Sequence, residues 1–201
     1  LYLCTDSGLM SCNTVEESVE RAIQGGVSVV QLREKEASSR ELFELAKRVK
    51  RVTDKYDVPL IINDRLDICL AVDAAGVHLG QTDLPCSEAR RILGAEKIIG
   101  VSAATPEEAA KAQSDGADYL GVGAVFATST KTNTRPVTAE TIRAIRSAVD
   151  IPFVVIGGVN SENISGLYGL GINGAAVISA IISQPDITAA ARKMRQAAER
   201  L

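Results

Sequence analysis

Basic side chains that suit a phosphorylated ligand occur at two separate places in the sequence. Arg33 and Lys35 lie close together, and Lys131 follows much later in the chain. One guanidinium and two ammonium groups fit a polyanion such as a diphosphate better than they fit a single carboxylate. Taken alone, Arg33 and Lys35 would be interpreted as solvated loop charges. The phosphate interpretation therefore depends on what else the fold brings near them.

Two aspartates could hold a divalent cation beside such a ligand. Asp64 and Asp83 each come shortly after a short apolar segment. Carboxylate oxygens are hard ligands, and Mg²⁺ takes few of them together with phosphate oxygens of a substrate. The structural alternative is that each aspartate caps a helix, a frequent role for Asp after a strand. We favour a magnesium site, because the basic residues already indicate a phosphate ligand.

A second anion site is indicated near the end of the chain. Gly158 follows one apolar segment, and Ile178 and Ser179 follow the next. Glycine lets backbone amides approach an anion closely, and the N-terminus of a following helix favours negative charge. Two anion sites imply two phosphorylated substrates, or one long one.

Short apolar segments recur along the chain and alternate with longer amphipathic segments. Several apolar segments are continuous, as expected for parallel strands that are buried on both faces. The amphipathic segments start with helix-capping patterns such as Ser38-x-x-Glu41 and Thr105-Pro106. We predict strands at residues 1–5, 27–32, 60–63, 76–79, 98–102, 119–122, 153–156 and 174–178.

These elements make eight β/α units within 201 residues. A compact (β/α)8 barrel, the TIM barrel of the α/β class, has this make-up. An open doubly wound sheet is the alternative, but eight similar units with no evident edge strand favour closure. We therefore expect residues 1–201 to form a single barrel domain.

The candidate residues follow the predicted strands, where the active site of such a barrel lies. The polar or glycine residues at these strand ends are Gln31, Arg33, Asn63, Asp64, Asp83, Ser102, Lys131, Gly158 and Ser179. Each has a structural explanation when it is taken alone. Their convergence on one rim makes a purely structural interpretation weak.

The composition argues against two classes of binding partner, nucleic acids and membranes. Twenty-two Lys and Arg against 25 Asp and Glu leave a net charge of −3, and aromatic residues make up 3% of the chain with no Trp. A nucleic-acid surface would need a basic patch and aromatic stacking, so we expect no nucleic-acid partner. No apolar segment approaches the roughly 18 residues of a membrane span, so we expect no membrane partner.

The cysteines indicate the cellular compartment of the protein, and the first residue concerns its N-terminus. The four cysteines form no C-x-x-C pair, which favours reduced thiols and a cytoplasmic protein over a disulfide scaffold. The sequence begins at Leu1 within a strand-like segment, so we expect the natural N-terminus upstream. The helices offer candidate faces for a homodimer, and nothing in the sequence identifies which face would be used.

Two apparent motifs do not change this interpretation. The glycines Gly169, Gly171 and Gly174 have dinucleotide-binding spacing, but they precede a predicted strand, whereas that fingerprint follows one. His78, the one histidine, lies inside a predicted strand, so we interpret it as a packed or second-layer residue rather than a catalytic base. One histidine and no paired cysteines also argue against a zinc site.

Several motifs together carry a resemblance to a known family. They are Gln31-Leu-Arg-Glu-Lys35, Asn63-Asp64-Arg65, Gly76-Val-His-Leu-Gly-Gln81 followed by Asp83, Gly100-Val-Ser102, Gly116-Ala-Asp-Tyr119 through Gly123, Thr128-x-Thr130-Lys131, and Ile156-Gly-Gly158. With these motifs the chain resembles the thiamine-phosphate synthase family, essentially from end to end. The combination is far more specific than any one motif.

The resemblance implies a reaction and a role for each matching residue. The reaction joins a hydroxymethylpyrimidine diphosphate to a thiazole phosphate, or its carboxylated form, and releases pyrophosphate. Asp64 and Asp83 would hold Mg²⁺, and Ser102 would touch the reacting region. The residues that would bind the pyrimidine diphosphate are Gln31, Leu32, Arg33, Glu34, Lys35, Asn63 and Lys131, and those that would bind the thiazole phosphate are Thr128, Thr130, Gly158, Ile178 and Ser179. Ser129 would also contact substrate.

The physical chemistry of that reaction agrees with these assignments. Loss of pyrophosphate builds negative charge on the leaving group, which Mg²⁺, Arg33, Lys35 and Lys131 would stabilise. We therefore expect Arg33, Lys35, Ser102 and Lys131 to be catalytic. The thiazole nitrogen is itself the nucleophile, so no histidine base is required.

The sequence departs from the family pattern at three alanines. Ala104 stands where family members often have histidine, and Ala124 and Ala127 stand where prolines are frequent. These changes bear on the shape of the heterocycle pocket and on loop rigidity. They leave the phosphate and metal groups untouched.

Three other functions fit these residues less well. A thiazole tautomerase-like isomerase of the same fold would bind only the thiazole phosphate and would not need the full cation set with both aspartates. A sugar-phosphate epimerase or aldolase would want a strand-end lysine or a pair of carboxylate bases. A non-catalytic sensor would bind either heterocycle and convert neither.

Overall fold

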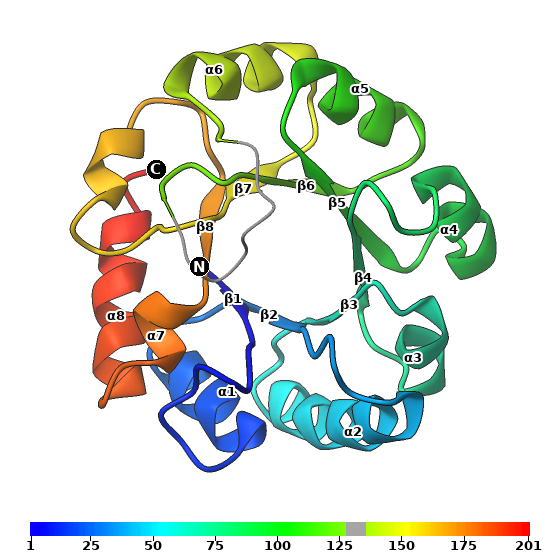
Figure 1. Cartoon of the computed structure of the whole chain (residues 1–201), viewed down its shortest axis with the longest axis vertical. Helices are drawn as coiled ribbons and strands as arrows, with labels where there is room; N and C mark the ends of the chain where they lie inside the picture. The colour runs from blue at the N-terminus through cyan, green and yellow to red at the C-terminus, as the bar shows by residue number, and fades with distance from the viewer. Residues whose placement is uncertain (128–135) are drawn as a thin grey trace.

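Eight parallel strands close into a barrel in the order in which they occur in the chain (Figure 1). The structure, a computed structural model, describes residues 1–127 and 136–201. Its strands are β1 (Tyr2–Cys4), β2 (Val29–Leu32), β3 (Leu60–Asn63), β4 (Gly76–Leu79), β5 (Ile98–Ala103), β6 (Tyr119–Val122), β7 (Phe153–Val155) and β8 (Gly174–Val177). Three of them have the predicted bounds, and the others differ by one or two residues at one or both ends.

The first and last strands join to complete the barrel. In β1, Tyr2 is in register with Val29 of β2 on one side and with Ala176 of β8 on the other. An open doubly wound sheet would leave edge strands without such partners. The predicted (β/α)8 fold is therefore confirmed, and the open sheet is excluded.

Helices surround the barrel on its outer side (Figure 1). Predicted caps start several of them: the Ser38 side chain and Glu41 form a complete capping box, and Thr105 accepts a hydrogen bond from Glu108 N before Pro106. The helices are α1 (Val15–Gln24), α2 (Ser39–Lys55), α3 (Leu66–Ala71), α4 (Cys86–Leu93), α5 (Pro106–Ser114), α6 (Ala139–Ala148), the 3₁₀ helix η1 (Ile164–Leu167), α7 (Ser179–Ile182) and α8 (Ile187–Ala198). Within the described ranges, no helix is both long and apolar enough to cross a membrane.

The buried side chains form two separate layers. The larger layer lies between the sheet and the helices, and it includes Leu32 and Val30 from β2. A smaller cluster, with Tyr2, Cys4 and Ile61, fills the inside of the barrel. Successive residues of a strand point to opposite faces, so every second residue of each strand faces the inside.

Small residues keep part of the inside open. Gly100 of β5 and Gly121 of β6 point inward, and a Cβ atom on Gly100 would lie 2.1 Å from the Tyr119 ring. A Cβ atom on Gly121 would lie 2.9 Å from His78. These two glycines therefore make room for an aromatic ring and an imidazole within the barrel.

Candidate active site

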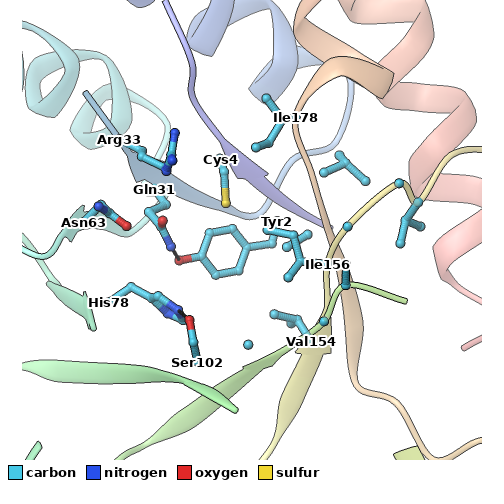
Figure 2. Close-up of a pocket in the computed structure, with 18 of the residues that line it drawn as sticks. Tyr2, Cys4, Gln31, Arg33, Asn63, His78, Ser102, Val154, Ile156 and Ile178 are labelled. Carbon is cyan, nitrogen blue, oxygen red and sulfur yellow. Dashed lines mark hydrogen bonds between the residues drawn. The ribbon is translucent and has the colours of Figure 1, made fainter. Parts of the chain in front are cut away.

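Two adjoining cavities open at the C-terminal ends of the strands. One, of about 150 Å³, lies within the barrel mouth (Figure 2), and the other, of about 450 Å³, lies over the ends of β2 to β5. The cavities adjoin, because both are lined by Arg33, Asn63, His78, Ser102 and Gly123. We refer to the two cavities together as the cleft.

The acidic part of the cleft contains Asp64 and Asp83. The pKa of Asp64 is raised from 3.8 to about 6 by burial and by its contact with the Asp83 carboxyl group, and Lys35 opposes this shift. Asp64 holds a left-handed backbone conformation with φ 63°, and the Gly80 N–H donates to Asp83 Oδ2 at 2.6 Å. The chain thus brings two carboxyl groups together, although their repulsion disfavours ionisation of both.

The carboxyl groups of Asp64 and Asp83 suit a divalent cation that takes most of its ligands from water and substrate. A bound cation would relieve the repulsion between the two carboxylates. In residues 1–127 and 136–201, no group of three or more His, Cys, Asp or Glu side chains could hold a metal. Mg²⁺ suits such a site, because it binds proteins through one or two carboxylates and completes its shell with water and substrate phosphate.

The basic part of the cleft faces these carboxyl groups. Lys35 Nζ lies 4.0 Å from Asp64 Oδ2, and its side chain is half-exposed. The loop after β1 contacts Arg33: the backbone N–H of Arg33 donates to Thr5 Oγ1 at 3.0 Å, and the side-chain Nη1 lies 3.7 Å from Asp6 Oδ2. Arg33 lines both cavities and therefore lies at their junction.

A chain of hydrogen bonds crosses the inside of the barrel and ends in the cleft. Gln31 Nε2 donates to Tyr2 Oη at 2.8 Å, and Tyr2 Oη lies 2.8 Å from Tyr119 Oη. His78 Nδ1 lies 3.0 Å from Tyr119 Oη, and His78 Nε2 lies 3.0 Å from Ser102 Oγ. The first and last of these contacts are drawn in Figure 2. Five side chains from five different strands are thus linked.

The far wall of the inner cavity is made by the loops after β7 and β8. Gly157 and Gly158 both have positive φ, and a Cβ atom on Gly158 would lie 2.4 Å from Ala127 O. Asn163 Nδ2 donates to Gly158 O at 2.8 Å, which fixes this turn. Ser179 begins α7 and lines the cavity with Ile178 and Gly158. Backbone N–H groups can approach an anion closely in such a turn.

Most of the predicted site residues that the structure describes lie in the cleft. Those that line it are Gln31, Arg33, Lys35, Asn63, Asp64, Asp83, Ser102, Gly158, Ile178 and Ser179. Thr128, Ser129, Thr130 and Lys131 lie outside the described residues.

Leu32 and Glu34 are not among the residues that line the cleft, and their role in substrate binding stays a prediction. Leu32 is fully buried between the sheet and the helices. Glu34 Oε2 accepts a hydrogen bond from Ser7 Oγ at 2.6 Å instead. The reason is the strand alternation: Gln31 and Arg33 point into the barrel, so the residues between and after them point away from it.

Tyr2, His78 and Gln81 also belong to the cleft, although the sequence offers no reason to assign them a role in binding or catalysis. Tyr2 and His78 line the inner cavity, and Gln81 Nε2 donates to Ser102 O at 2.6 Å at the rim of the outer one. The available signal was the period of two: Tyr2 faces the same interior as the polar residues at the strand ends. An aromatic residue in a strand otherwise indicates ordinary core packing.

Comparisons with known proteins agree with this geometry. The family model described as thiamine monophosphate synthase matches residues 1–181. A thiamine-phosphate synthase of Ruminiclostridium cellulolyticum is 58% identical over 96% of this chain and 92% of its own length. One of Clostridium botulinum is 52% identical over 100% of this chain and 94% of its own length.

A solved structure gives the same result. The thiamine phosphate pyrophosphorylase of Pyrococcus furiosus superposes with a TM-score of 0.91 at 40% identity, over 98% of this chain and 94% of that one. The resemblance drawn from the motifs is therefore confirmed. Matches of sequence and structure over nearly the whole length show that the chain is an enzyme of the thiamine monophosphate synthase family.

Proposed function

We propose that this enzyme condenses an aminopyrimidine methyl diphosphate with a thiazole phosphate to give thiamine monophosphate and pyrophosphate. The single observation that carries the proposal is that two adjoining cavities share lining residues at the mouth of the barrel. Arg33 and the two aspartates line the outer part of the cleft, and Gly158 and Ser179 line its inner part. One cleft thus offers separate places for a diphosphate and for a monophosphate.

The bond changes need no proton transfer. The C–O bond between the pyrimidine methylene and the diphosphate breaks, and its electron pair leaves with pyrophosphate. The lone pair of the thiazole nitrogen then forms the new C–N bond, and the nitrogen becomes a quaternary thiazolium. Because no proton moves, the chain needs charge stabilisation and alignment rather than a general base.

Asp64 and Asp83 are the residues that would hold Mg²⁺. When bound, this ion would neutralise charge that develops on the departing pyrophosphate. The support for this assignment is the contact between the two carboxyl groups and the resulting shift in the pKa of Asp64.

The other residues of the cleft stabilise and align the reactants. Arg33, braced by Thr5 and Asp6, and Lys35 supply positive charge beside the leaving diphosphate, and we assign the same role to Lys131. Ser102 presents a hydroxyl group at the point where the two cavities meet. A thiazole phosphate in the turn at Gly158 and Ser179 would bring its ring nitrogen toward this point.

A two-substrate assay with purified protein tests the proposal. Pyrophosphate release and thiamine monophosphate formation are measured with both substrates, with each alone, and with EDTA in place of Mg²⁺. We expect both products, in equal amounts, only when both substrates and Mg²⁺ are present.

Two results would contradict the proposal. Undiminished turnover in EDTA would remove the assignment of Asp64 and Asp83 to a metal site. Conversion of the thiazole phosphate alone, with no pyrophosphate from the pair, would point instead to an isomerase that uses only the inner cavity.

A further inference from the structure

The hydrogen-bond chain from Gln31 to Ser102 has a direction. Gln31 Nε2 is a donor only, and it donates to Tyr2 Oη at 2.8 Å. Burial raises the pKa of the phenols of Tyr2 and Tyr119 well above their usual value, so each phenol keeps its single proton. The direction of the hydrogen-bond chain then follows from which acceptor each of these two phenol protons faces.

The proton of Tyr2 points to Tyr119. The two phenol oxygens lie 2.8 Å apart, so one of them donates to the other. If Tyr119 were the donor, the Tyr2 proton would need another acceptor, and the buried residues that cluster with Tyr2 are Ile61, Ala176 and Cys4, none of which has a strong side-chain acceptor. A buried hydroxyl without a good acceptor is costly. Tyr2 is therefore the donor in this pair.

The proton of Tyr119 then points to His78. Because Tyr119 Oη accepts from Tyr2, its own proton is available for His78 Nδ1 at 3.0 Å. An imidazole nitrogen that accepts a hydrogen bond carries no proton, so the ring proton lies on Nε2. Nε2 faces Ser102 Oγ at 3.0 Å, and it donates there.

We propose that this directional chain holds His78 as the Nε2–H tautomer and turns the Ser102 hydroxyl proton into the cleft. Ser102 Oγ already accepts from His78, so its proton is the group that it offers to an acceptor atom of the ligand. Tyr119 and His78 are then positioning residues that act through Ser102. The glycines at 100 and 121 are required for this arrangement, because they leave the space that the two rings occupy.

The first test measures the tautomer directly. His78 is the one histidine of the chain, so protein labelled with ¹⁵N-histidine gives one imidazole spin system without assignment work. At pH 8 we expect a protonated, pyrrole-type Nε2 and an unprotonated, pyridine-type Nδ1. A pyrrole-type Nδ1, or a fully protonated ring, would overturn the proposal. This measurement does not depend on the proposed function.

The second test asks whether Tyr119 acts through Ser102, and it rests on the proposed function. We expect Tyr119→Phe to lower kcat about tenfold by removing one hydrogen bond, with KM nearly unchanged, and to mix the two tautomers in the ¹⁵N spectrum. In the double variant with Ser102→Ala, the loss should equal that of Ser102→Ala alone. Full additivity of the two losses would contradict a route through Ser102.

A matched control separates this effect from general loss of a phenol group. Tyr56 Oη donates to Glu20 Oε1 at 2.9 Å on the outer side of the barrel, so Tyr56→Phe removes a hydrogen-bonded hydroxyl far from the cleft. We expect this control to retain the wild-type tautomer and kcat. If it changed both as much as Tyr119→Phe does, the proposal would be wrong. If the NMR result holds and no turnover is seen in any variant or in the wild type, only the proposed function fails.

Discussion

The carboxyl group of Asp64 resists ionisation in the folded chain, because it is partly buried against Asp83. Its pKa is about 6 in the fold and 3.8 without these contacts. As pH rises between these values, the unfolded chain gives up its proton first, so the folded state loses stability over this window and does not regain it above pH 6. A shift of this size corresponds to about 3 kcal/mol for a fully shielded group, and solvent access at the cleft reduces it to about 1 kcal/mol.

Asp64→Asn should therefore stabilise the metal-free protein at neutral pH and not at acidic pH. We expect the free energy of unfolding to exceed that of the wild type by about 1 kcal/mol at pH 8 and to match it near pH 4. Urea unfolding in EDTA at both pH values measures this difference. Added Mg²⁺ should stabilise the wild type and leave the variant unchanged. An equal gain at both pH values would show that the like-charge contact is not its cause.

Asp83 makes a hydrogen bond that one substitution at this position can keep and another cannot. Its Oδ2 accepts from the Gly80 N–H, and an asparagine oxygen can keep that bond whereas alanine cannot. Both variants should lose about 100-fold or more in kcat, because the proposed metal site loses one of its two carboxylates. Only Asp83→Ala should also lose about 1 kcal/mol of stability. Steady-state kinetics and urea unfolding of the pair check both parts, and an active Asp83→Asn would contradict the metal assignment.

Strand β5 shows how one glycine shapes an element. A Cβ atom on Gly100 would lie 2.1 Å from the Tyr119 ring, whereas one on Gly166 of η1 would meet no atom within 4 Å. Gly100→Ala should therefore displace Tyr119, destabilise the protein by about 1–3 kcal/mol and lower kcat. Gly166→Ala is the matched control and should change neither quantity measurably. Equal stabilities for the two variants would contradict the prediction, because they would show that the barrel interior accommodates a Cβ atom at residue 100.

The strands also show which site residues a sequence can reveal. Gln31, Asn63 and Ser102 were found because polar side chains at the ends of apolar strands are unusual. Tyr2 was not found, because an aromatic residue at such a position has an ordinary explanation in core packing. Leu32 and Glu34 belong to the same motif as Gln31 and Arg33, but they are not among the residues that line the cleft. The alternation of the strand sends neighbouring side chains to opposite faces.

At the scale of the whole molecule, the barrel could be predicted because each unit repeats the same local signals. Continuous apolar strands, capping residues and the absence of an edge strand all pointed to closure, and β1 pairs with β8 as that requires. The hydrogen-bond chain could not be predicted in the same way. It joins five strands across the interior, and its contacts depend on the register of all of them. No local pattern in the sequence carries that information.

Substitutions between the sheet and the helices should change mainly stability, whereas substitutions in the cleft should change mainly activity. Met194 of α8 is 1% exposed and packs in the layer between the sheet and the helices, whereas Ser102 lines the cleft. Met194→Ala should cost about 2–4 kcal/mol in the free energy of unfolding, because it leaves a cavity, and kcat at 25 °C should stay within about twofold. Ser102→Ala should do the reverse, with a large loss of kcat and a small change in stability. Urea unfolding and steady-state kinetics on both variants measure the contrast. A loss of kcat in well-folded Met194→Ala would show that the outer helices help to set the geometry of the cleft.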